Sequence, residues 1–154
     1  MNVIRAHSHS KLNSIRVDVK NSDLNELKIL EEMMNVVRLK VNKSSSDANE
    51  VKLNLNRPFA KTLSDQLDLL LSDNFNIFVM DTDSFQNSLF VLANYYYNFY
   101  KWENLKITEI KFMNLIYNVQ KNYNGNSYHN MIHAADVTNT CFVILEKMEE
   151  VVMA

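Results

Sequence analysis

Glycine and proline are nearly absent from this chain: Gly125 and Pro58 are the only ones among 154 residues. Loops that cradle a phosphate in Rossmann and Walker folds need two or three glycines within a few positions, so neither loop can form here. All-β sandwiches and barrels place glycine and proline at their many corners. Apolar residues make up 47% of the chain and charged residues 22%, a globular balance. We therefore predict an all-α fold.

The charge of the chain is almost balanced, with sixteen Lys and Arg, eighteen Asp and Glu and a formal net charge of -2. The chain therefore lacks the strongly basic surface that would attract a nucleic acid polymer, and it lacks the polybasic patch of a membrane-surface protein. Residues 1–20 hold no apolar signal-peptide core, and the apolar runs are far shorter than the ~20 residues of a membrane span. We expect a cytoplasmic protein, or one at the cytoplasmic face of a membrane if a longer product carries spans.

Residues 1–57 are predicted to form an N-terminal region with one amphipathic helix over residues 22–41 and a linker. Ser22 is a good cap, and six apolar residues follow it at helical spacing: Leu24, Leu27, Leu30, Met34, Val37 and Val41. The sequence leaves two alternatives for this helix: it packs within its own domain, or it binds a partner helix. The polar segment 42–58 reads as a linker, with a strand-like alternation over 51–55, and the compact part begins near Pro58. Residues 17–19 hint at a short strand, and His7 and His9 fall in a tail expected to be mobile.

Residues 58–154 show helical spacing in four stretches, which predict helices over 62–71, 83–100 and 108–124 and from about residue 129 onward. Residues 74–78 are predicted to be an apolar connector, and 101–106 a short loop. Gly125 is expected to end the third helix in a left-handed conformation. The aromatic run 95–100 is expected to pack inside the bundle. The only cysteine, Cys141, lies in an apolar run and is expected to be a buried thiol.

Two histidines in the last stretch carry the clearest chemistry. His129 and His133 are four residues apart, which puts both imidazoles on one face if both lie in a helix, with Asp136 near that face. Such a pair could hold a metal together, as a metal-binding helical protein would, or divide into one ligand and one general acid. Asn130 stands where the zincin motif requires glutamate, which argues against a metalloprotease.

The run around these histidines resembles the signature that opens the metal site of class I cyclic nucleotide phosphodiesterases, Tyr-His-Asn-x-x-His-Ala-x-Asp-Val. The matching residues are Tyr128, His129, Asn130, His133, Ala134, Asp136 and Val137. A looser resemblance extends over residues 62–145 and includes the phenylalanine-bearing segment 75–78. It implies that residues 58–154 are the N-terminal part of an all-α, HD-type phosphodiesterase catalytic domain.

The resemblance also implies a reaction and roles. The family hydrolyses a 3′,5′-cyclic nucleotide, cAMP or cGMP, to the 5′-monophosphate with divalent metals, zinc and magnesium or manganese. His129 would be the catalytic residue that gives a proton to the leaving sugar oxygen and also contacts substrate, Tyr128 would lie beside the substrate, and His133 would bind the zinc. Asp136 would have a supporting role.

The family's other functional residues have no counterpart among the 154. A His-Asp pair on a later helix, a further aspartate, and the glutamine and phenylalanine that hold the purine are missing. We therefore expect a domain truncated at its C-terminus that is a poor metal binder and inactive alone. We also expect apolar faces left uncovered, open to self-association or to a helical partner. The alternative is a non-enzymatic helical interaction module or an incomplete gene product.

Overall fold

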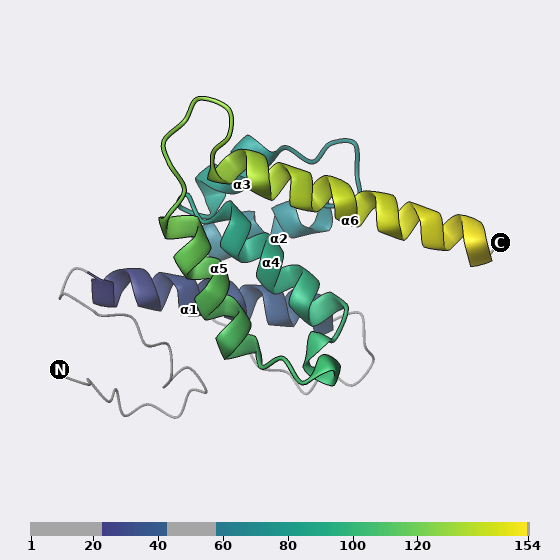
Figure 1. Cartoon of the computed structure of the whole chain (residues 1–154), viewed down its shortest axis with the longest axis horizontal. Helices are drawn as coiled ribbons and strands as arrows, with labels where there is room; N and C mark the ends of the chain where they lie inside the picture. Colours follow the sequence, from purple (N-terminus) through teal and green to yellow (C-terminus); the bar gives the residue numbers. More distant parts are fainter. Residues whose placement is uncertain (1–22, 43–57, 154) are drawn as a thin grey trace.

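The computed structural model describes residues 23–42 and 58–153, and these residues form helices joined by turns, with no strand among them (Figure 1). The all-α prediction is confirmed. The elements are α1 (Asp23–Asn42), α2 (Pro58–Asp68), α3 (Ile77–Asp83), α4 (Ser88–Phe99), the 3-10 helix η1 (Trp102–Leu105), α5 (Glu109–Lys121) and α6 (Met131–Met153). The histidine tail, the two strand-like segments and the linker lie outside the described residues. None of the described helices is long and apolar enough to cross a membrane.

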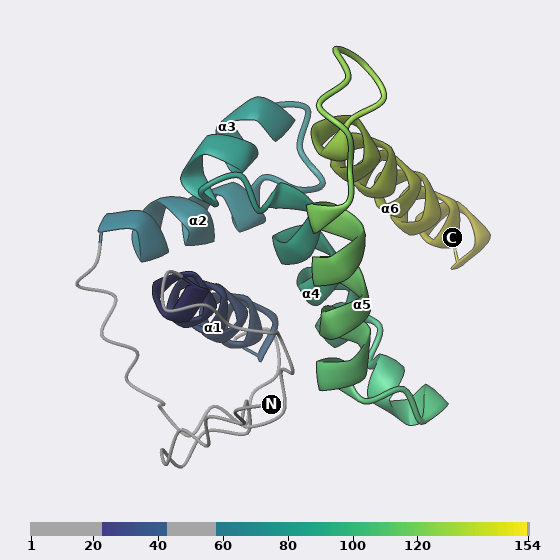
Figure 2. The same cartoon turned by 60° about the vertical axis from the view of Figure 1, so that its left-hand side comes forward.

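Helix α4 is the centre of the fold. It packs against α1, α5 and α6, and Figure 2 shows it between the α1–α2 pair and the other two helices. The consecutive residues Leu89, Phe90, Val91 and Leu92 are all buried, because every side of this part of α4 faces a neighbour. A helix that is apolar all round is stable only in such a place.

Helix α1 belongs to the same core as the helices that follow Pro58. It packs against α2 and α4, and its buried side chains are Leu30, Met33, Met34, Val36 and Val37. Of the two alternatives left open for this helix, the structure shows packing within its own fold.

Several helix boundaries differ from the sequence prediction. Helix α2 begins at Pro58, because proline is well suited to the first helical position, where its missing N–H costs no hydrogen bond. The predicted connector over residues 74–78 is wrong at its C-terminal end, because α3 starts at Ile77 with Asn76 as its N-cap. The Asn76 side-chain oxygen accepts hydrogen bonds from the N–H groups of Phe78 and Val79 at 2.9 and 3.4 Å. Helix α4 begins at Ser88, later than predicted.

The only glycine does not end α5. That helix stops at Lys121, and the N–H of Asn122 bonds back to the carbonyls of Asn118 and Val119 at 3.2 and 3.1 Å. Gly125 has no positive φ, so the predicted left-handed cap is wrong. The left-handed positions among the described residues belong instead to Phe85, Gln86, Lys101 and Lys106.

Candidate functional site

The candidate site lies where the loop after α5 enters α6. The side-chain oxygen of Asn130 accepts a hydrogen bond from the N–H of His133 at 3.0 Å, which makes Asn130 the N-cap of α6. His133 therefore lies in the first turn, whereas His129 lies in the loop before the cap. The prediction that both histidines share one face of a helix is wrong, because the helix begins between them.

The loop nevertheless brings the three predicted site residues together. The ring of Tyr128 lies 4.5 Å from that of His133 and 5.0 Å from that of His129, centre to centre. The two imidazoles are 5.7 Å apart and almost perpendicular, at 83°. Tyr128 and His129 are exposed and His133 is half-buried, so the cluster is open to a ligand.

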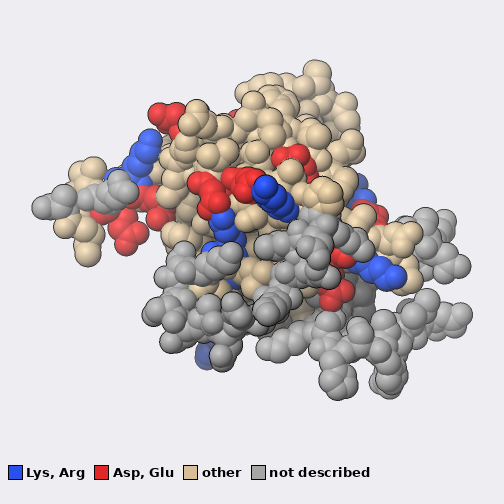
Figure 3. All heavy atoms as spheres, turned by 180° about the vertical axis from the view of Figure 1, so that it is seen from behind, with Lys and Arg blue, Asp and Glu red and all other residues tan. Residues whose placement is uncertain are grey.

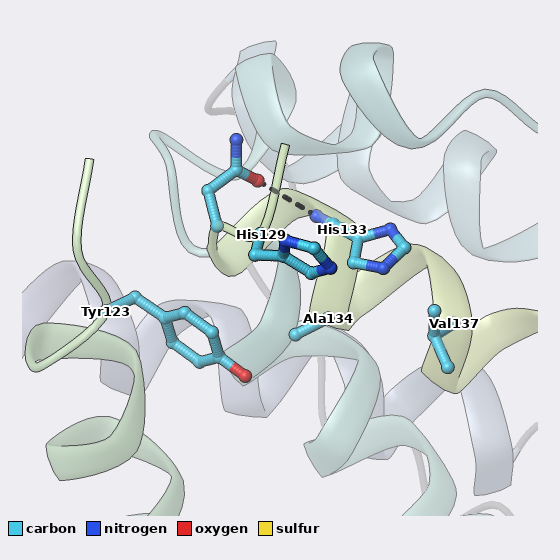
Figure 4. Close-up of a pocket in the computed structure, with 6 residues that line it drawn as sticks. Tyr123, His129, His133, Ala134 and Val137 are labelled. Atoms are coloured by element: carbon cyan, nitrogen blue, oxygen red, sulfur yellow. Dashed lines mark hydrogen bonds between the residues drawn. The ribbon is translucent and has the colours of Figure 1, made fainter. Parts of the chain in front are cut away.

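The two histidines also border an open pocket of about 340 Å³ (Figure 4). Its lining residues are Tyr123, His129, Asn130, His133, Ala134 and Val137. Figure 4 shows Tyr123 and Val137 on opposite sides of the two imidazoles. The pocket therefore offers two imidazoles and a phenol beside an apolar wall, and Tyr128 is not among its lining residues.

Tyr123 is the lining residue that the sequence analysis did not single out. It follows the end of α5, and the loop carries it to the first turn of α6. Its sequence signal is weak: a tyrosine five residues ahead of Tyr128, just past a helix end.

Helix α6 is held beneath the site by buried polar contacts. The hydroxyl of Tyr96 on α4 donates to the side-chain oxygen of Asn139 at 2.8 Å, and the Asn139 amide donates to the carbonyl of Leu70 at 3.4 Å. Nearer the site, the Ser88 hydroxyl donates to the Asp81 carboxylate at 2.7 Å and lies 3.4 Å from the sulfur of Met131. These contacts fix which face of α6 turns inward, and hence where His133 points.

The described residues contain no group of three or more His, Cys, Asp or Glu that could hold a metal ion. Asp136 and Cys141 are both exposed. The prediction of a buried thiol is therefore wrong, because Cys141 lies on the side of α6 away from the core. A catalytic zinc needs three or four protein ligands, which His129 and His133 do not supply.

Comparison of the chain with protein-family models, with curated proteins and with solved structures yields no match. A functional proposal therefore depends on the residue run 128–137 and on the geometry of its rings.

Proposed function

We propose that this chain carries part of the catalytic site of a 3′,5′-cyclic nucleotide phosphodiesterase, which hydrolyses cAMP or cGMP to the 5′-monophosphate. The observation that supports the proposal is the adjacency of Tyr128, His129 and His133, whose rings lie within 5.7 Å of one another, with the two histidines bordering a pocket. These are the positions to which the resemblance assigns substrate contact, proton donation and metal binding.

His129 is suited to the proton-transfer role in this proposal. Its imidazole is exposed and borders the pocket, and histidine changes charge near neutral pH. When the bond between phosphorus and the sugar O3′ breaks, the leaving oxygen takes a proton, and an imidazolium at this position supplies it. Tyr128, whose ring contacts His129 edge-on at 82° and His133 at a tilt of 35°, is the residue proposed to contact the nucleotide.

The metal is the part of the proposal that these residues do not complete. His133 would give one ligand, and no three His, Cys, Asp or Glu side chains come together in residues 23–42 and 58–153. No reaction step through a metal follows from this donor set, and we expect no turnover by the chain alone. Hydrolysis of cAMP or cGMP by the purified chain with zinc and either magnesium or manganese would overturn that expectation.

Zinc binding at the two histidines tests the assigned roles. We expect a titration followed by NMR of the histidine side chains to show weak zinc binding at His133. The variant His133→Ala should lose it, and His129→Ala should retain it. Equal losses in the two variants would contradict the proposal and support a metal-binding protein that uses both imidazoles.

Reading the coding sequence beyond Ala154 is a second test. A His-Asp pair within an apolar helix would supply the further ligands that the phosphodiesterase proposal requires. Its absence from the transcript would favour the second candidate, a non-enzymatic helical interaction module. That candidate now rests on the uncovered outer face of α6, because α1 is packed within the fold.

A further inference from the structure

The loop between α5 and α6 contains the only glycine of the chain, and neither the backbone conformation nor the available space requires glycine there. Gly125 has no positive φ. A Cβ added at this position would meet no atom within 4 Å. Alanine would therefore fit the loop as it stands. What glycine does provide is a backbone N–H with no side chain beside it, in peptide linkage to Asn124.

Asn124 and Gly125 are exposed and lie outside any helix. The loop that carries them projects beyond the helices in both Figure 1 and Figure 2. Within residues 23–42 and 58–153, no hydrogen bond holds the Asn124 side chain or the Gly125 N–H. The fold therefore leaves both groups accessible to each other and to water.

The other asparagines of this loop are held by hydrogen bonds. The side-chain amides of Asn122, Asn126 and Asn130 each donate to a backbone carbonyl, at 2.8, 3.5 and 3.1 Å respectively. Each of the three is also followed by a residue that carries a side chain. Within residues 122–130 of the described chain, Asn124 alone combines a side-chain amide that makes no hydrogen bond with a following residue that lacks a side chain.

An asparagine amide next to an unhindered backbone nitrogen can react within the chain, because the two groups are already held together. The Gly125 nitrogen attacks Cγ of Asn124, and the bond between Cγ and Nδ2 breaks. The amide nitrogen leaves as ammonia and takes the proton of the Gly125 N–H, which leaves a five-membered succinimide. Water then opens the ring at one of its two carbonyls and gives aspartate or isoaspartate. The reaction uses only water.

We propose that Asn124 is a site of spontaneous deamidation, which places a carboxylate in the loop that carries the candidate site. Residues 122–135 contain no Asp, Glu, Lys or Arg, and Figure 3 shows an uncharged surface at this end of the molecule (upper right). The carboxylate is thus the first charge in this segment. In the isoaspartyl product the main chain is also one methylene longer between Tyr123, which lines the pocket, and His129. The proposal does not depend on the phosphodiesterase function.

Incubation of the full folded chain in mildly alkaline buffer, followed by peptide mass spectrometry, tests the site. We expect the peptide that contains Asn124 to gain about one mass unit, at least about tenfold faster than the hydrogen-bonded Asn126 does. Gly125→Ala should slow the reaction at Asn124 by about tenfold or more, because the added methyl group hinders attack by the nitrogen. Equal rates in Gly125→Ala and the wild type would overturn the proposal.

A peptide of residues 119–130 separates the effect of the fold from that of the sequence. The peptide has no tertiary structure to protect its amides. Because the folded loop holds neither reacting group, the folded chain should deamidate at Asn124 at a rate within about tenfold of the peptide. A folded chain slower than that would show that the fold protects Asn124, and it would overturn the proposal.

NMR of aromatic side chains tests whether the modification reaches the candidate site. The isoaspartyl form carries one more negative charge, so ion exchange separates it from the unmodified chain. Its ring signals from Tyr123 and His129 should shift, because the added methylene lies between them. The indole signal of Trp102 is the control and should not move, since Trp102 precedes α5 and the loop follows it. Unchanged signals from both Tyr123 and His129 would overturn the effect on the site.

Discussion

The side-chain oxygen of Gln120, on α5, accepts a hydrogen bond from the backbone N–H of Phe90 in the first turn of α4, at 3.1 Å. The cap residue of α4, Asn87, makes no capping bond with its own side chain. The Gln120 amide instead donates to the Asn87 side-chain oxygen at 2.6 Å, and Asn87 donates to the carbonyls of Ser84 and Phe85. The central helix is therefore capped by a buried residue from another helix.

Replacing Gln120 should be costly for this reason. Gln120→Leu leaves the N–H of Phe90 and the side-chain oxygen of Asn87 without partners in the core, which should lower the free energy of unfolding by about 2–3 kcal/mol. Urea unfolding measures the change. Asn118→Leu, two residues away at an exposed position, is the control and should cost less than ~0.5 kcal/mol. Equal costs for the two variants would contradict a capping role for Gln120.

Apolar spacing in the sequence predicts the long helices because it reports the face that packs. Apolar residues recur at helical spacing in the segments of α1, α5 and α6, and all three helices form. The start of α4 is not predictable in this way, since Phe85 and Gln86 adopt φ angles of 50° and 62° and a distant Gln120 caps the helix. A side chain from another helix and a strained turn leave no periodic signal.

The turn before α4 gives a prediction of the opposite sign. Gln86 is exposed and has a left-handed backbone, which costs a residue other than glycine about 1–2 kcal/mol. Gln86→Gly should therefore raise the free energy of unfolding by about 0.5–1 kcal/mol, after the greater freedom of the unfolded chain is subtracted. Lys111→Gly, at an exposed position within α5, should lower it by about 1 kcal/mol. Thermal unfolding of both variants measures these opposite changes in stability. Destabilisation in both would mean that glycine at position 86 relieves no backbone strain in the turn.

The candidate site is predictable in its members but not in its geometry. The run 128–137 identifies Tyr128, His129 and His133, and the structure brings their rings together. The helix start at Asn130 separates the two histidines, which spacing alone does not reveal. Tyr123 reaches the pocket through the path of a loop, and a loop path is set by tertiary packing.

Asn130 should support the site through the helix it caps. Asn130→Ala removes the oxygen that accepts the His133 N–H and should cost about 1 kcal/mol of stability. Asn130→Ser keeps an acceptor at the cap and should cost no more than a few tenths. Amide hydrogen exchange at residues 131–134 measures the fraying directly. Equal protection in the two variants would show that the cap does not hold the first turn.

Glu109 makes the free energy of unfolding depend on pH in the acidic range. Burial would raise the pKa of its carboxyl, but hydrogen bonds from Arg38, Asn94 and Asn98 outweigh burial and hold the pKa below its ordinary value of 4.5. The three partners lie on α1 and α4, so the carboxylate joins α5 to both helices; its bond to Arg38 is 2.6 Å. A carboxyl group whose pKa is lower in the folded protein than in the unfolded chain stabilises the fold at pH values above its unfolded-state pKa. That contribution is lost as the pH falls through its folded-state pKa.

We therefore expect Glu109→Gln to cost about 1–2 kcal/mol at pH 7 and to cost progressively less below about pH 4.5, where the wild-type carboxylate takes up its proton. Urea midpoints of both proteins between pH 7 and pH 2.5 measure this, and the two curves should converge at the acid end. Asp65→Asn, on the exposed surface of α2, is the control and should follow the wild-type curve. Parallel curves for Glu109→Gln and the wild type would show that the protonation of Glu109 does not contribute to the acid response.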